Sequence, residues 1–258
     1  MTPIEGWIEA TGLPAGVRGG TATRRFDGVS EPPYGRANYG EQCGDQPVAV
    51  ARNRALLRES LGLAREPLWL RQVHGTAVVV LESSGASSAL HGQSSAAPVA
   101  DACLVHGSGL AAAVLTADCL PILLAAEGSD EVAAIHAGWR GLAAGVIEAT
   151  LARMNAATAS IRAWLGPAIG QDAFEVGPEV RAAFVDADPG AAACFRRGRD
   201  DRWHADLADL ARRRLLALGV TRISGGDFCT VEDPASFHSF RRDGVTSGRM
   251  ATLVWRSP

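Results

Sequence analysis

Short apolar runs, separated by glycine, proline and acidic residues, fill the middle of the chain. Four of these runs predict strands that are buried on both faces, because each is too short for a typical helix and lacks polar alternation. They span residues 99–105, 110–117, 121–125 and 132–135. Strand-type patterns also occur at 68–73, 76–81, 161–165, 222–228 and 250–255.

Apolar residues spaced three or four apart predict helices between these strands. The longest predicted helix spans 140–154, and another, over 48–61, ends at Gly62. Two more are predicted at 178–185 and 206–218. Short strands with peripheral helices indicate an α+β fold of layered mixed β-sheets flanked by helices. We expect residues 1–258 to form a single domain, with the small-residue segment 83–97 as a surface loop inside it.

The amino-acid composition limits which binding partners and which cellular location we expect for the protein. Apolar residues make up 47% of the chain and charged residues 21%, a globular balance, and the net charge of -3 gives no reason to expect nucleic acid or an anionic membrane. The longest apolar stretch, 109–126, is interrupted by Asp118 and Pro121, so no membrane span is expected. Five cysteines without a CxxC pair, and no signal peptide pattern, predict reduced thiols and a cytoplasmic location.

Three segments place a reactive side chain beside glycine or proline at the end of a predicted strand. These side chains are His74, Cys119 and His136. Two imidazoles and one thiolate suit zinc, and three protein ligands with a fourth position open are typical of a catalytic zinc site. Their long separations are unlike a zinc finger. The alternative therefore stays open that Cys119 is a buried apolar residue and that both histidines are structural.

Three further residues have a chemical and a structural interpretation. Arg140 follows Gly138 at a predicted helix start, where a guanidinium and free N–H groups suit phosphate, although a surface ion pair fits equally well. Asp118 places a carboxylate beside Cys119, although an Asx turn explains it as well. Arg241 lies in 236–244, which fits a loop that stacks a base and binds an anion; an edge strand with an Asp-Gly hairpin is the slightly favoured alternative.

Taken in order, these segments resemble the laccase-domain family, also called the multicopper polyphenol oxidase family. The resemblance runs from about Asn38 to the C-terminus. It rests on Gln72-Val-His74-Gly75, Thr116-Ala-Asp118-Cys119, His136-Ala-Gly-Trp-Arg-Gly141, Leu165-Gly-Pro-Ala-Ile-Gly170 and Arg241-Arg-Asp-Gly244 with Gly248-Arg-Met-Ala251. One departure is visible: the family's usual Asn-Leu-Gly…Val-Gly-Asp reads Asn38-Tyr-Gly-Glu-Gln-Cys43-Gly-Asp45 here.

The resemblance implies a fold similar to that of certain deamidating toxins and a zinc ion on His74, Cys119 and His136. Bacterial members are described as purine nucleoside phosphorylases, which convert adenosine, inosine or guanosine and phosphate into the free base and ribose 1-phosphate. Members also act on methylthioadenosine and deaminate adenosine. The residues that this resemblance leads us to expect in catalysis are Cys119, Asp118 and Arg140, with Asp118 as an orienting group or proton carrier. Those expected to contact substrate are Arg140, Asn38, Gln72 and Arg241.

Three other functions compete with this one. A multicopper oxidase would need on the order of ten histidines for its copper ions, and the chain has six. A single copper on the same three ligands remains possible in the test tube, which leaves copper-dependent phenol oxidation as a weak alternative. A metal-free cysteine hydrolase or amidase would use Cys119 as nucleophile and His136 or His74 as base. A purine-binding module would bind nucleosides without turnover.

Overall fold

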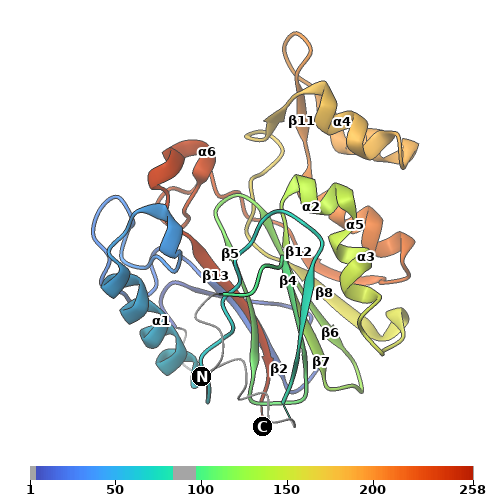
Figure 1. The fold of residues 1–258 in the computed structure, drawn as a ribbon. Helices are drawn as coiled ribbons and strands as arrows, with labels where there is room; N and C mark the ends of the chain where they lie inside the picture. Colours follow the sequence, from blue (N-terminus) through green and yellow to red (C-terminus); the bar gives the residue numbers. More distant parts are fainter. Residues whose placement is uncertain (1–3, 84–96, 258) are drawn as a thin grey trace.

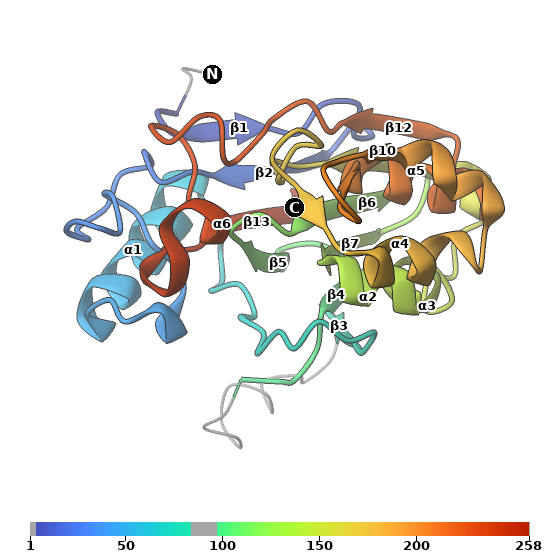
Figure 2. The same ribbon diagram turned by 90° about the horizontal axis from the view of Figure 1, so that it is seen from above.

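Two β-sheets pack face to face at the centre of the molecule, with helices on both outer faces (Figures 1 and 2). The protein is seen here in a computed structural model that describes residues 4–83 and 97–257. One sheet has six strands in the order β12-β8-β6-β7-β4-β3, and the other has four in the order β1-β2-β13-β5. The predicted α+β class with layered mixed sheets is therefore confirmed.

The six-stranded sheet is built around the predicted apolar runs. Its strands are β12 (Arg222–Gly225), β8 (Ile161–Leu165), β6 (Leu120–Ala126), β7 (Glu131–Ala137), β4 (Ala102–His106) and β3 (Val78–Glu82). The pairs β12–β8 and β3–β4 are parallel and the other neighbouring pairs are antiparallel. Every residue of β6 and β7 is buried, as continuous apolar strands require when both faces are covered.

The four-stranded sheet is antiparallel and closes one face of the larger sheet. Its strands are β1 (Trp7–Glu9), β2 (Val17–Ala22), β13 (Met250–Arg256) and β5 (Ala111–Thr116). Val114 and Val254 from this sheet share one core with Leu123, Val132 and Ala134 of the six-stranded sheet. The chain passes from one sheet to the other in the short turn between β5 and β6.

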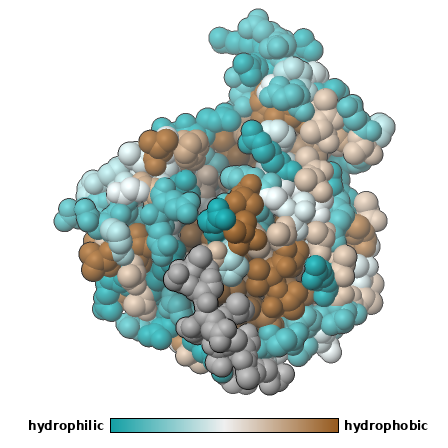
Figure 3. All heavy atoms as spheres, in the orientation of Figure 1, coloured by the Kyte–Doolittle hydropathy of each residue, from teal (hydrophilic) through white to brown (hydrophobic). Residues whose placement is uncertain are grey.

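Helices complete the outer layers. The helices α2 (Trp139–Ala144), α3 (Val146–Leu151) and α5 (Leu207–Ala217) lie over the six-stranded sheet, and α1 (Pro47–Leu61) lies over the four-stranded one (Figure 2). Beyond them, α4 (Pro178–Val185) projects with the small sheet of β9 (Glu175–Val176), β10 (Phe195–Arg197) and β11 (Trp203–Ala205). The tip of this projection is hydrophilic (Figure 3). No helix in the described part of the chain is long and apolar enough to cross a membrane.

Most predicted elements are present, but the helix over 140–154 and the strand over 68–73 were predicted wrongly for identifiable reasons. The helix predicted over 140–154 is two helices, because Gly145 adopts φ 97° and ends α2. The strand predicted over 68–73 contributes only an isolated bridge from Arg71 to Val99. Here the Gln72 side chain occupies the free edge of β5 in place of a strand, bonding both N–H and C=O of Leu115.

The Asp-Gly hairpin favoured for 236–244 was also wrong. Ser239 caps the first turn of α6 (Phe240–Asp243) by accepting a hydrogen bond from the N–H of Arg242, and Gly244 ends the helix. Five short strands were not predicted: β1, β2, β9, β10 and β11. Most of the predicted surface loop, residues 84–96, lies outside the described residues.

Candidate metal centre

One edge of the six-stranded sheet collects the three predicted metal ligands. Antiparallel pairing places the start of β6, the end of β7 and the start of β4 at this edge. Cys119 directly precedes β6 and His136 is near the end of β7, while His74 lies in the segment that leads into β3. Residues far apart in sequence therefore meet where the sheet ends and side chains can reach solvent.

The geometry of the three side chains fits a metal ion. The ligand atoms of His74, Cys119 and His136 all lie within 4.8 Å of one another, and the Cys119 Sγ lies 3.6 Å from His74 Nε2. His136 is buried, Cys119 is half-buried and His74 is exposed, so the cluster opens to solvent on the His74 side. Such a donor set, closed on one side and open on the other, suits zinc with a free coordination position.

A glycine makes room for this cluster. A Cβ added to Gly138 would lie 3.0 Å from the Cys119 Sγ and 2.6 Å from the His74 ring. Side-chain carbons essentially never approach so closely, so only glycine permits the three ligands to converge over the start of α2. This requirement explains the glycine that follows His136 and Ala137 in the sequence.

Cys119 and His136, the two less exposed members of the cluster, shift each other's pKa. Burial alone would raise the pKa of the Cys119 thiol, but the His136 imidazolium and hydrogen bonds from both histidines lower it to about 6. Burial alone would lower the pKa of His136, but the Cys119 thiolate and the Asp101 carboxylate raise it to about 9. Without metal, the pair is therefore a thiolate beside an imidazolium at neutral pH, and the thiolate is the form that binds metal.

Asp101, which the motif analysis missed, lies directly behind the cluster. It is fully buried and accepts a hydrogen bond from His136 Nδ1 at 2.8 Å. Burial opposes its ionisation, yet hydrogen bonds from His136 and from the N–H of Gly75 hold the pKa of the carboxyl below its usual value. The available signal was a charged residue within a run predicted to be a buried strand, since buried charges need partners.

Asp118 and Arg241, both predicted site residues, meet each other beside Cys119. Asp118 adopts φ 88° in the turn between β5 and β6. Its carboxylate accepts hydrogen bonds from the Thr230 hydroxyl and from the N–H of Arg241, each at 2.6 Å. The Arg241 guanidinium donates to the carbonyls of Ala173 and Glu175. Asp118 thus joins the Cys119 turn to the first turn of α6.

Asn38 and Gln72, predicted to contact substrate, make internal hydrogen bonds. Asn38 is fully buried; its amide oxygen accepts from the N–H groups of Gly40 and Arg249, and its NH₂ group donates to Asp45 and Gly40. Gln72 is half-buried and bonds the backbone of Leu115. Gln72 thereby anchors the segment that leads to His74, and Asn38 ties its own loop to the residue before β13.

Arg140 faces solvent, as Arg241 also does. Its guanidinium stacks over the Trp139 ring at 4.5 Å, and within the described residues it has no acidic partner within salt-bridge distance. Stacking on an aromatic face orients a guanidinium without neutralising its charge. Arg140 is therefore available for an anion near the metal cluster.

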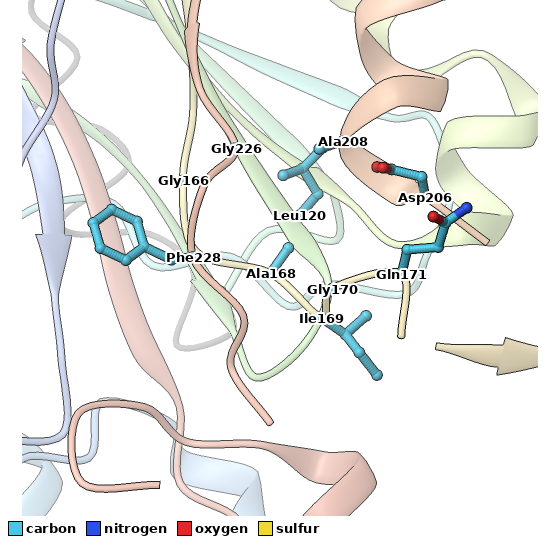
Figure 4. A pocket seen from close by; sticks show the side chains of 10 residues that line it. All are labelled: Leu120, Gly166, Ala168, Ile169, Gly170, Gln171, Asp206, Ala208, Gly226 and Phe228. Carbon is cyan, nitrogen blue, oxygen red and sulfur yellow. The ribbon is translucent and has the colours of Figure 1, made fainter. Parts of the chain in front are cut away.

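A small cavity of about 80 Å³ has Leu120, the residue that follows Cys119, in its lining (Figure 4). Leu120 lines it together with Gly166, Ala168, Ile169, Gly170, Gln171, Asp206, Ala208, Gly226 and Phe228. The Leu120 side chain belongs to the core under the helices. His136 pairs with Pro121, the next residue of β6, and successive side chains of a strand point to opposite faces. The cavity is therefore separate from the metal cluster.

We predict that Gly138→Ala weakens zinc binding by roughly tenfold or more, the scale seen when the support of a metal ligand is disturbed. The added methyl group would push apart the His74 ring and the Cys119 thiolate. Gly75→Ala is the control, since a Cβ there would meet no atom closer than 3.5 Å. Zinc affinity is measured by competition with a chelator, and equal affinities for both variants would contradict the prediction.

In metal-free protein, we predict that iodoacetamide alkylates Cys119 with a rate that rises through a midpoint near pH 6, following the thiol pKa of about 6. Zinc should suppress the reaction. The buried thiols of Cys103 and Cys194, whose burial raises their pKa to about 12 and about 11, should stay unmodified. Peptide mass spectrometry assigns the alkylated residue, and a midpoint near 9 would show that the histidines do not act on the thiol.

Sequence and structure comparisons place the chain with the same set of proteins. The chain is 46% identical to "Purine nucleoside phosphorylase YfiH" of Escherichia coli (strain K12), covering 94% of this chain and 95% of that protein. It is 45% identical to "Purine nucleoside phosphorylase" of Xylella fastidiosa (strain 9a5c), covering 99% of each.

Solved structures agree with the sequence matches. Neisseria meningitidis protein NMB0706 superposes with a TM-score of 0.89 at 43% identity, covering 98% of this chain and 100% of that one. YlmD from Geobacillus stearothermophilus gives a TM-score of 0.88 at 30% identity, covering 100% and 98%. The family model described as "Multi-copper polyphenol oxidoreductase laccase" matches residues 20–257. As the sequence motifs predicted, the chain belongs to the multi-copper polyphenol oxidoreductase laccase family.

Proposed function

We propose that this protein is a zinc-dependent purine nucleoside phosphorylase that cleaves adenosine, inosine or guanosine with phosphate. The observation that carries the proposal is the convergence of His74, Cys119 and His136 within 4.8 Å at a solvent-open sheet edge. The names of the relatives, which are purine nucleoside phosphorylases, support an enzyme acting on nucleosides and phosphate. This donor set favours zinc over the several copper ions that the family description suggests.

The reaction needs no further reactant. A phosphate oxygen forms a bond to the anomeric carbon of the ribose while the carbon–nitrogen bond to the purine breaks. The purine leaves with the electron pair of that bond and takes up the proton that hydrogen phosphate gives up. When bound, zinc supplies a Lewis acid that stabilises negative charge on substrate oxygens. The products are the free base and ribose 1-phosphate.

Arg140 is the residue that we assign to phosphate. It is exposed, oriented by Trp139 and only four residues after His136. A guanidinium fork matches two phosphate oxygens. Because α2 has only six residues, we assign the anion to this side chain rather than to the start of the helix.

The other predicted site residues receive supporting roles in this proposal. Asp118 orients the Cys119 turn rather than carrying protons, because both its carboxylate oxygens are already hydrogen-bonded. Gln72 anchors the segment before His74 to Leu115, and Asn38 organises its own buried loop. Arg241 links α6 to the segment around Phe174, over whose ring its guanidinium lies at 5.6 Å. Cys119 acts as a metal ligand, and its thiolate is the anionic member of the set.

A second candidate function follows from the Cys119 environment. A thiol with a pKa of about 6 and a histidine nitrogen 3.6 Å away is also the arrangement of a cysteine nucleophile with its base. Such a hydrolase would work without metal. Chelation therefore separates the two functions: removing zinc should abolish phosphorolysis, whereas it would expose the thiol and preserve or increase hydrolase activity.

We extend the proposal to adenosine deamination and methylthioadenosine phosphorolysis, both of which the sequence resemblance implies. Product identity separates the reactions, because deamination of adenosine gives inosine and ammonia, and phosphorolysis gives adenine and ribose 1-phosphate. We also propose a cytoplasmic location, supported by five cysteines that form no disulfide.

The direct test is an assay with adenosine and phosphate. We predict that the zinc-loaded protein produces ribose 1-phosphate and adenine. The rate of phosphorolysis should fall at least about a hundredfold in Cys119→Ala, because the reaction needs the metal and the metal needs its thiolate ligand. Products are separated by chromatography. Adenosine turnover that is the same in both proteins, or absent from the zinc-loaded wild type, would contradict the proposal.

Phosphate binding is tested separately at Arg140. We predict that Arg140→Ala raises the KM for phosphate at least tenfold, on the order of 1.5 kcal/mol or more for a charge-assisted contact. Zinc content and the KM for the nucleoside should change little. Arg65→Ala, an exposed arginine shortly after α1, is the matched control. An unchanged phosphate KM would remove Arg140 from this role.

A further inference from the structure

We infer that Asp101 is the positioning residue that holds both histidine ligands of the metal centre with a single carboxylate. The inference rests on the proposed zinc site and deepens it. Asp101 touches neither substrate nor metal in this account. It acts through His74 and His136, which come from different segments of the chain and share this partner.

The contact with His136 fixes which imidazole nitrogen is left for the metal. Asp101 Oδ1 lies 2.8 Å from His136 Nδ1, so this nitrogen keeps its proton and Nε2 is the nitrogen that gives up its proton when metal binds. A second contact holds the backbone, since the N–H of His136 donates to the carbonyl of Asp101 at 2.7 Å. Ring and main chain of His136 are therefore both tied to the same residue.

The contact with His74 is made through its backbone. Three successive N–H groups, those of Val73, His74 and Gly75, point at the Asp101 carboxylate, with distances of 2.9 Å from His74 and 2.7 Å from Gly75. His74 has φ 62°, a left-handed conformation that is unfavourable for a residue with a side chain. The carboxylate compensates for this strain by satisfying all three donors, and the resulting turn directs the imidazole toward Cys119.

Position 101 requires a side chain in which both terminal atoms accept hydrogen bonds, as in a carboxylate. Among the described residues, the groups within hydrogen-bond distance of the Asp101 carboxylate are all donors: the ring of His136 and the three N–H groups of the turn. The amide of asparagine, nearly identical in shape, would turn an NH₂ group toward at least one of these donors. The change leaves a buried donor unpaired and permits the other His136 tautomer.

The test compares Asp101→Asn with a matched control, Glu131→Gln. Glu131 is also a buried carboxylate of the same sheet, and it accepts hydrogen bonds from the N–H groups of Asn155 and Ala156 and lies 3.3 Å from His106 Nδ1. It lies at the opposite end of β7 from His136. Both variants remove a buried acid beside a histidine, but only one should affect the metal.

We expect Asp101→Asn to weaken zinc binding about 10- to 100-fold in a chelator competition, the range for loss of a carboxylate behind a histidine ligand. The visible spectrum of the cobalt-loaded variant should also change. Glu131→Gln should keep the wild-type zinc affinity and cobalt spectrum, although thermal unfolding of both metal-free variants should occur at lower temperature. Equal zinc affinity in wild type and Asp101→Asn, or equal losses in the two variants, would overturn the inference.

A measurement on the wild type covers the case in which Asp101→Asn does not fold. In the ¹⁵N spectrum of the zinc-loaded protein, His136 should carry its proton on Nδ1 and bind zinc through Nε2. The reverse assignment would overturn the role of Asp101 even though the zinc site exists. A wild type that binds no zinc would instead contradict the proposed function, and this inference with it.

Discussion

The complete burial of β6 and β7 is the constraint on which the rest of the structure depends. Both strands lie between a second sheet and a layer of helices, so their interiors admit only apolar residues. Polar and reactive groups can be placed only where these strands end, and the end shared by β6, β7 and β4 gathers a thiol, an imidazole and a carboxylate. The site is thus a consequence of the layering: the turn that carries Cys119 is also the passage between the two sheets.

Much of the fold could be predicted because its central strands carry a strong apolar signal. The runs that became β5, β6, β7 and β8 needed no tertiary information, and Gly62 ended α1 as predicted. The failures occurred where tertiary contacts outweigh local pattern. Residues 68–73 look like a strand but meet β5 through the Gln72 side chain, and β2 contains two glycines in VRGGTA that weaken its strand pattern.

The sequence indicated the three candidate ligands that converge in the structure, but not the residue that supports them. Residue type, and a position beside glycine or proline, identify His74, Cys119 and His136 in the sequence. Asp101 is not identified in this way, because its importance lies in which donors converge on it, and these come from the His74 turn and from β7. Asn38 is the opposite case, in which the sequence suggested a functional residue. The family motif led us to expect a substrate contact there, yet the side chain is buried and hydrogen-bonds backbone groups. A sequence shows donors and acceptors but not which of them are already paired.

The proposed metal centre is tested most directly by the metal content and ligand set of the protein purified without added metal or a metal-affinity resin. Mass spectrometry of the metals, combined with X-ray absorption at the metal edge, gives both in one sample. We predict one zinc ion on each chain, bound by two nitrogen ligands and one sulfur ligand from His74, His136 and Cys119. Several copper ions on each chain, or zinc without a sulfur ligand, would contradict it.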